Sequence, residues 1–175
     1  ALAYTNLCSC LCQLGEHSES IEYGKRAISV FEEFSLRDAS AYQENLSLSY
    51  CSLAGTLCEC EKYEESLENY YKALDIEEER AESLGNANIE TLARICYNIS
   101  IVCGYLEDYD NEESYLLRSV EEYRKYYEIL PEAAEYNYLS AFRAACVFYI
   151  ESGEFEVARE WLTPYIDFVQ TLNEQ

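Results

Sequence analysis

Apolar residues along the chain recur three and four positions apart, which is the period of an α-helix. The first stripe comprises Leu7, Leu11 and Leu14, and the second comprises Ile21, Ala27, Ile28 and Phe31. Gly15 and Glu16 interrupt the pattern between the two stripes. The spacing therefore predicts a pair of helices joined by a tight turn.

The same pattern returns after 46 residues without a gap. One column holds small residues, namely Cys8, Ala54, Ser100 and Cys146. A second is aliphatic, with Ile28, Leu74, Val120 and Ile166, and a third is aromatic, with His17, Tyr63, Tyr109 and Phe155. We therefore expect one array over residues 1–175, made of four units at about 1–37, 38–83, 84–129 and 130–175.

Turn and cap signals set the expected helix limits. Helices are predicted near 1–14, 16–34, 39–60, 62–81, 88–106, 110–129, 132–152 and 154–171. Asp110 and Glu113 read as a capping box, and Pro131 suits a first helical turn. Gly85 is expected to end a helix, with Asn86 or Asn88 capping the next. Pro164 lies inside the last helix, where it should produce a kink.

A single helical pair cannot bury both of its faces, so such pairs are expected to stack. The small column would let two helices approach closely, and the aromatic column would fill the hole at each turn. The predicted fold class is all-α, an α-solenoid of antiparallel helical hairpins. We expect a right-handed superhelix whose concave surface is lined by the first helix of each unit.

This pattern resembles the tetratricopeptide repeat, most closely in residues 14–22 and 60–68. The long unit is similar to the variants in kinesin light chains and in bacterial regulatory proteins. Glu61 and Glu107 replace the Gly of the family's turn, and Glu112 replaces a small residue. The resemblance implies recognition of a protein or peptide, without a cofactor and without catalysis.

Acidic residues dominate the charge. Asp and Glu number 34 against 12 Lys and Arg, giving a net charge of −22. Such a field repels phosphate backbones, which argues against nucleic acid, and it attracts basic proteins or peptides. The alternative interpretation is a solvated surface that keeps the protein soluble.

Nothing in the sequence directs the chain to a membrane. There is no signal segment, and no apolar run approaches the roughly 20 residues that a membrane span requires. Nine cysteines in a chain with few turns favour reduced thiols in the cytoplasm over a disulfide scaffold. Met is absent and the chain opens within a helical pattern, so we expect a fragment of a larger protein.

The predicted peptide-binding groove is formed by first-helix residues that face away from the second helix. Its principal members are Asn6, Gln13, Arg94, Tyr97, Asn98, Tyr105 and Arg143, with Ser9, Ser52, Gly55, Glu59, Ile101, Val147 and Glu151 beside them. Arg is scarce, and Arg94 and Arg143 could hold a carboxylate or a peptide backbone. Alternatively, these arginines only neutralise neighbouring acids.

Chaperone-binding members of the resembled family clamp a C-terminal carboxylate with Asn and basic side chains. Asn6 and Asn98 match that residue type, whereas Ser52 and Ala144 occupy the same column and no Lys lines it. A chaperone adaptor is therefore not the favoured interpretation.

Metal and catalytic sites are not favoured either. Cys8 and Cys10 point about 200° apart on a helix and cannot chelate one ion, and most other cysteines fall in core columns. His17 is the one histidine and belongs to the aromatic turn column, so no catalytic triad can be assembled. Paired acids such as Glu64 and Glu65 lie on second helices and suit a solvated face.

The leading functional hypothesis is a protein-interaction module that binds a peptide or partner segment in the groove. The alternative is the regulatory or sensory arm of a larger enzyme or transcription regulator. A third hypothesis is self-association through the ends of the array. The convex face and the 18 tyrosines remain alternative binding surfaces to the groove.

Overall fold

The computed structural model describes residues 1–173, apart from the side chains at 84–86, 165, 167–168 and 171–173. The described chain contains eight α-helices and one short 3-10 helix, η1, and no strand. They are α1 (Leu2–Gln13), α2 (His17–Ser35), α3 (Ala39–Glu59), α4 (Tyr63–Leu84), η1 (Gly85–Asn88), α5 (Ile89–Tyr105), α6 (Tyr109–Ile129), α7 (Pro131–Glu151) and α8 (Phe155–Asn173). All eight predicted helices are present, with ends that shift by a few residues.

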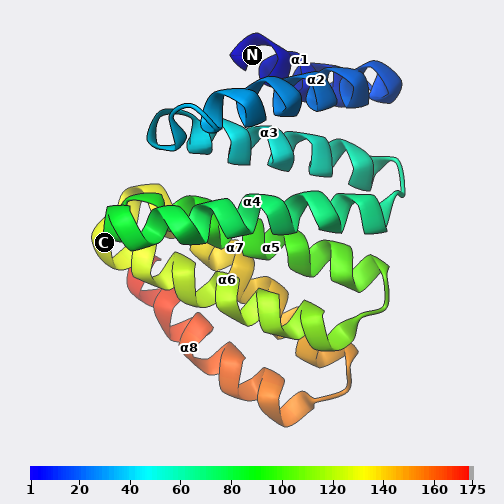
Figure 1. The fold of residues 1–175 in the computed structure, drawn as a ribbon. Coiled ribbons are helices and arrows are strands. Elements are labelled where there is room, and N and C mark those ends of the chain that lie inside the picture. The colour runs from blue at the N-terminus through cyan, green and yellow to red at the C-terminus, as the bar shows by residue number, and fades with distance from the viewer. Residues whose placement is uncertain (174–175) are drawn as a thin grey trace.

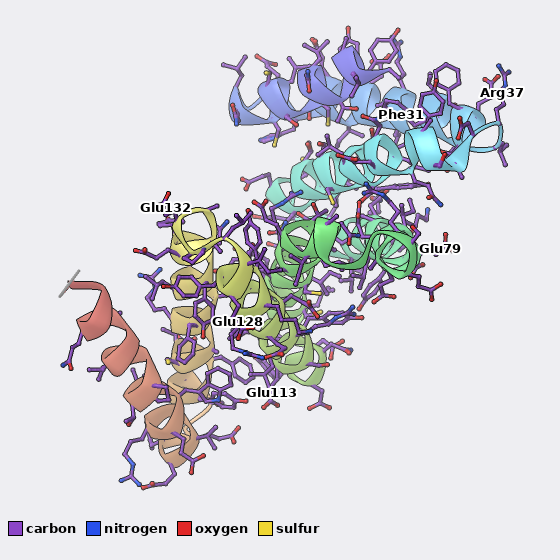
Figure 2. All side chains as sticks on the ribbon, turned by 90° about the vertical axis from the view of Figure 1, so that its left-hand side faces the viewer. Phe31, Arg37, Glu79, Glu113, Glu128 and Glu132 are labelled. Atoms are coloured by element: carbon purple, nitrogen blue, oxygen red, sulfur yellow. The ribbon has the colours of Figure 1, made fainter. Side chains whose placement is uncertain are left out.

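The helices form antiparallel pairs that stack in chain order, from α1 and α2 to α7 and α8 (Figure 1). Each odd-numbered helix after α1 also packs on the even-numbered helix that precedes it. Successive pairs are rotated, so that α7 runs across the direction of α1 in the view of Figure 2. The fold is therefore an all-α solenoid, as predicted.

Packing follows the predicted small and aliphatic columns. Cys8, Ala54, Ser100 and Cys146 are all buried where helices cross. Ile28, Leu74 and Val120 are buried between successive pairs, whereas the fourth member of the aliphatic column, Ile166, is 49% exposed. Ile166 lies on α8, which no following helix covers in the described chain.

Only part of the aromatic column packs at the turns: Tyr63 is partly buried against the core, whereas two other members are exposed, contrary to expectation. Tyr109 and Phe155 are 60% and 68% exposed. Tyr63 stacks on Tyr105 with 4.8 Å between ring centroids. His17 is partly buried, and its Nδ1 atom has no hydrogen-bond partner in the described chain.

The four turns inside the helical pairs share one geometry despite their different residues. Gly15 and Gly153 have φ angles of 77° and 81°, and Glu61 and Glu107 both have 58°. At Glu61 the amide donates to the Cys58 carbonyl, and the next amide donates to the Leu57 carbonyl. This pair of backbone hydrogen bonds is the Schellman motif, and it recurs at the other three turns.

The expected capping box at Asp110 and Glu113 is wrong. Asp108 caps α6, because its side chain accepts a hydrogen bond from the Asn111 amide. The left-handed residue Glu107 ends the preceding turn, so the cap must follow it directly. Asp110 and Glu113 therefore lie inside the helix.

The two prolines occupy different positions in their helices. Pro131 occupies the first turn of α7, where its missing amide hydrogen leaves no bond unmade. Pro164 lies within α8, and the helix continues past it. No described helix is both long enough and apolar enough to cross a membrane.

A buried carboxylate ties α4 to the start of α5. Glu77 is 1% exposed and accepts two hydrogen bonds from Arg80, at 2.7 and 2.8 Å. The Asn88 amide donates to the Glu77 side chain at 2.8 Å and to its carbonyl at 2.7 Å. Asn88 is the N-cap of α5, yet its side chain makes no bond to that helix. Arg80 also pairs with Glu44 of α3, at 2.9 Å.

Candidate binding groove

The first helices meet closely at the N-terminal end of the stack. Hydroxyl side chains join α1 to α3: Thr5 to Ser49 at 2.8 Å and Ser9 to Ser52 at 3.3 Å. The Ser20 hydroxyl of α2 reaches Thr56 at 2.8 Å beneath this contact. Short polar side chains therefore close the first-helix face between α1 and α3.

The first helices are open between α5 and α7. No comparable packing joins these two helices in the described chain. A cavity of about 340 Å³ lies between them, and α6 supplies its floor. Its lining comprises Tyr97, Ser100 and Ile101 of α5, Glu112 and Leu116 of α6, and Arg143, Ala144, Val147, Phe148 and Glu151 of α7. We call this cavity the α5–α7 groove.

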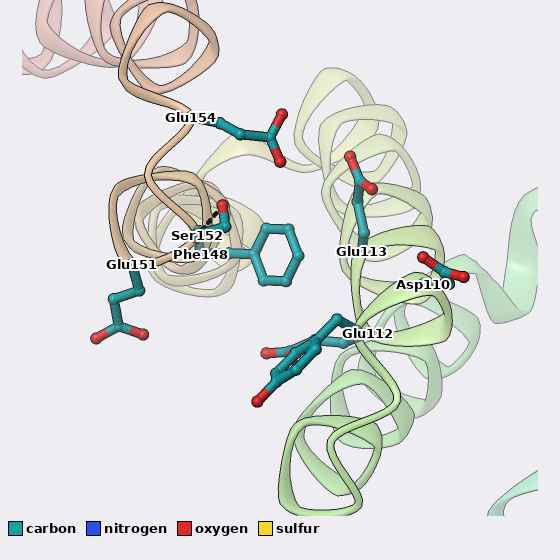
Figure 3. Close-up of a pocket in the computed structure, with 8 residues that line it drawn as sticks. Asp110, Glu112, Glu113, Phe148, Glu151, Ser152 and Glu154 are labelled. Atoms are coloured by element: carbon teal, nitrogen blue, oxygen red, sulfur yellow. Dashed lines mark hydrogen bonds between the residues drawn. The ribbon is translucent and has the colours of Figure 1, made fainter.

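Glu112 makes the crossing of α5 and α6 different from the others. Its equivalents Ser20 and Ser66 are fully buried and donate to carbonyls of the facing helix, at 2.7 and 2.8 Å. The longer Glu112 side chain extends from α6 toward α7 (Figure 3). A Cβ atom on Gly104 would lie 3.0 Å from the Glu112 carboxyl group. The sequence thus pairs a large acid with a glycine, where the other units place a small residue.

A second cavity continues the groove toward the turn before α8. It has a volume of about 470 Å³ and shares Glu112, Phe148 and Glu151 with the groove. Its remaining lining is mostly acidic: Tyr109, Asp110, Glu113, Ser152 and Glu154. We call this cavity the acidic pocket (Figure 3). Glu113 is already engaged there, since it accepts a 2.6 Å hydrogen bond from the Tyr149 hydroxyl.

Electrostatics at Glu112 disfavour its ionised form. Burial raises the pKa of Glu112, and the Glu151 carboxylate raises this pKa further. Glu112 forms no hydrogen bond or ion pair with any described side chain. A cation placed between Glu112 and Glu151 would therefore relieve an existing repulsion.

Two arginines differ from all the others in the described chain. Six arginines form ion pairs with glutamate: Arg26, Arg37, Arg80, Arg118, Arg124 and Arg159. Within the described residues, Arg94 and Arg143 form none. These two are the arginines predicted for the groove.

The predicted groove residues do not all lie together. Tyr97 and Arg143 both line the α5–α7 groove. Arg94 and Asn98 are partly exposed on α5 but do not contribute to its lining, and Tyr105 stacks on Tyr63 at the end of α5.

The remaining predicted groove residues, Asn6 and Gln13, are exposed on α1. They lie at the other end of the stack, where α1 packs directly on α3 (Figure 1). The predicted set therefore spans the whole first-helix face, whereas the groove occupies only its C-terminal part.

Five groove residues were not predicted for the groove from the sequence: Ser100, Glu112, Leu116, Ala144 and Phe148. The repeat positions of Leu116 and Phe148 show no residue pattern that would predict a place in the groove lining. Glu112 did carry a signal, since it departs from a column that is otherwise small.

The buried cysteines pack as small apolar residues, as predicted. Five of the nine are buried: Cys8, Cys51, Cys96, Cys103 and Cys146. Burial raises the pKa of Cys51 to about 12 and the pKa values of Cys96 and Cys103 to about 11. These thiols are therefore protonated at neutral pH and serve as packing groups.

Known structures share the fold at low sequence identity. RapI, in its apo form, aligns with a TM-score of 0.76 and 17% identity over 98% of this chain. A Rap protein complexed with competence and sporulation factor aligns at 0.69 and 18% identity over 94%. The chain spans 56% and 41% of those two proteins. Repeats of a proposed kinesin light chain align at 0.73 and 14% identity, over 97% of this chain and 74% of that one.

The fold and these comparisons define the class: a helical-repeat solenoid. More particularly, residues 93–126 match the tetratricopeptide repeat family model, and the fold is shared with a solved structure of tetratricopeptide-like repeats. The matched segment covers most of α5 and α6, which carry the Glu112 crossing. A search of the curated proteins found no match to the chain.

Proposed function

We propose that this chain is a protein-interaction module that binds a peptide or partner segment in the α5–α7 groove. The observation that carries the proposal is Arg143. It lines an open groove and forms no ion pair with a described carboxylate, although the chain has a net charge of −22. An unpaired guanidinium among many acids is a ready donor for a partner's carboxylate or carbonyl groups.

The groove lining also suits a peptide. Tyr97, Ile101 and Val147 are at least partly exposed, and Leu116 supplies an apolar floor. Aromatic and aliphatic surface of this kind supplies binding free energy when a partner covers it. We infer that the protein's acidic field favours partners with basic residues, because complementary charge accelerates encounter.

A second candidate function is the regulatory arm of a larger protein. Its support is that the similar Rap structures extend well beyond the part that this chain spans. One of them was solved with competence and sporulation factor bound. In this second proposal the same groove would read a signalling peptide and pass the binding event to an attached effector domain.

A displayed random-peptide library tests the groove. The unmodified chain is expected to enrich defined sequences, and Val147→Asp should remove that enrichment by placing a charge on the apolar groove wall. Ile129→Asp, at an exposed apolar position outside the groove, is the matched control and should keep it. Circular dichroism would establish that both variants fold. Equal enrichment by all three proteins would contradict the proposal.

A further inference from the structure

The α5–α7 groove has opposite charges at its two ends. Arg143, Val147 and Glu151 lie four residues apart on α7, so they form one stripe along its exposed side. Eight residues of helix rise by about 12 Å, which sets the separation of Arg143 and Glu151 along the axis. Arg143 supplies a cation at one end, and Glu151 supplies an anion at the other.

The anionic end is reinforced from the floor of the groove. Glu112 of α6 lines the same two cavities as Glu151, and burial together with the Glu151 carboxylate raises the pKa of Glu112. Neither carboxylate forms an ion pair in the described part of the chain. Two unneutralised acids therefore face the groove where it opens into the acidic pocket.

The middle of the groove is apolar. Val147 stands between the two charged ends, and Leu116 lies beneath it on α6. Phe148 closes the side next to the acidic pocket. An aliphatic or aromatic side chain entering here would lose its contact with water on several sides.

From this arrangement, and resting on the proposed peptide-binding function, we propose the chemistry of the partner: an extended peptide segment with a basic side chain, an apolar side chain and an acidic side chain in line. The basic group binds between Glu112 and Glu151, the apolar group packs on Val147 and Leu116, and the acidic group pairs with Arg143. An extended peptide advances about 3.3 Å per residue, so the two charged residues are about four positions apart.

Segments that carry charges of only one sign should bind the groove less tightly than the mixed segment. A segment with two basic groups would place one of them against Arg143. A segment with two acidic groups would place one against Glu112 and Glu151, whose repulsion is already present. Like charges brought together at an interface oppose binding, so the mixed segment should be selected over both.

Three short labelled peptides test this selection by fluorescence anisotropy, at an ionic strength of about 0.15 M to limit long-range steering. The mixed peptide is Gly-Ser-Lys-Ser-Leu-Ser-Glu-Ser-Gly with both ends blocked. A dibasic peptide has Lys in place of its Glu, and a diacidic peptide has Glu in place of its Lys. The unmodified chain should bind the mixed peptide about fivefold more tightly than either of the others.

Charge-reversal variants show whether the groove makes the selection. Glu151→Arg should shift the preference to the diacidic peptide, and Arg143→Glu should shift it to the dibasic peptide. Two controls change the net charge equally outside the groove: Glu59→Arg, at the equivalent repeat position on α3, and Arg159→Glu on α8. Both controls should keep the preference for the mixed peptide.

The outcomes separate the inference from the function on which it rests. A preference that follows the groove charges in both variants supports it. In a second outcome, the chain binds the peptides and Val147→Asp abolishes binding, but the two charge-reversal variants keep the same order of peptide affinities as the unmodified chain. The partner chemistry is then wrong and the groove function survives. If no peptide binds and Val147→Asp also leaves library enrichment unchanged, both are wrong.

Discussion

Individual residues that depart from the repeat explain the most specific features of this molecule. Glu112 takes the place of a buried Ser in the first two units and supplies a carboxylate to the groove floor. Glu77 takes a place that Phe31 and Tyr123 hold in neighbouring units, and it brings a charge into the core. Each departure places an acid where the repeat otherwise keeps small or apolar groups, and each has its own energetic consequence.

Glu112→Gln is expected to stabilise the protein at neutral pH. Burial and Glu151 raise the pKa of Glu112 in the folded state, so its ionisation opposes folding. Replacing the carboxylate by an amide removes that opposition. The gain in melting temperature should be largest near pH 7 and should shrink as the pH falls toward 4.5, the ordinary pKa of the group.

Glu121→Gln is the control with the opposite sign. Hydrogen bonds from Arg124 lower the pKa of Glu121, so its ionised form supports folding above the ordinary pKa, and that support is lost as pH falls through the lowered value. This variant should be destabilised, if at all, near pH 7. A Glu112→Gln variant that melts at the same temperature as the parent at every pH would show that Glu112 is not under electrostatic strain.

Arg80→Leu is expected to destabilise the chain strongly. The substitution leaves the Glu77 carboxylate buried with only Asn88 as its partner. Removing one member of a buried ion pair typically costs about 3–5 kcal/mol of unfolding free energy. Urea denaturation would measure the change.

The double variant Glu77→Leu/Arg80→Leu completes that experiment. It removes both charges and should recover much of the lost stability. Arg26→Leu, which breaks an exposed pair with Glu22, should change the unfolding free energy by no more than about 1 kcal/mol. If the double variant is less stable than Arg80→Leu, the ion pair has a specific role beyond neutralising Glu77.

At the scale of elements, one turn geometry joins the two helices of every pair. The turn requires a left-handed residue, and the chain uses Gly at two of these positions and Glu at the other two. The backbone hydrogen bonds are the same in all four turns. Stacking of the helical pairs therefore imposes the turn even where the residue is poorly suited to it.

Glu61→Gly and Glu107→Gly are each expected to stabilise the protein. A left-handed conformation costs a non-glycine residue about 1–2 kcal/mol, and glycine's greater freedom in the unfolded chain offsets part of the gain. We expect a net increase of about 0.5–1 kcal/mol in unfolding free energy for each variant, measured by urea denaturation. A Glu68→Gly change, at an exposed position inside α4, should instead destabilise by about 1 kcal/mol. Loss of stability at Glu61 would mean that its side chain contributes a contact that outweighs the strain.

At the scale of the whole molecule, stacking decides which surfaces are closed. Every interior pair is covered on both sides, and Cys51, Cys96 and Cys103 become part of the core. The first-helix face is closed between α1 and α3 by hydroxyl contacts and open between α5 and α7. The same repeated architecture therefore provides both a sealed region and a groove.

Thiol labelling should show which cysteines the stacked helices cover. Cys10 is exposed and should react with iodoacetamide in the native protein. Cys96 and Cys103 are buried and have pKa values raised to about 11, so they should react only after unfolding. Mass spectrometry of peptides labelled with and without urea would measure the order. Rapid native labelling of Cys96 would mean that the α5 crossing opens in solution.

The sequence by itself determined the repeat and therefore the elements. A period of 46 residues with helical spacing predicted eight helices, their pairing and the buried columns. Local residue signals predicted the helix caps less well. The N-cap of α6 follows from the left-handed turn at Glu107 and not from the acidic pair at Asp110 and Glu113. Periodicity reports which face of a helix is buried, because successive units inside the array meet similar neighbours.

Only the tertiary structure decided where the stack is open. Arg94 and Arg143 look equivalent as scarce cations on first helices, yet only Arg143 lines the groove. Asn6 matches the residue type of Asn98 but lies where α1 packs on α3. The distance between neighbouring first helices depends on side-chain volume at several crossings together, such as Glu112 against Gly104. Helical period is a property of one segment, whereas a groove is a property of how three helices pack.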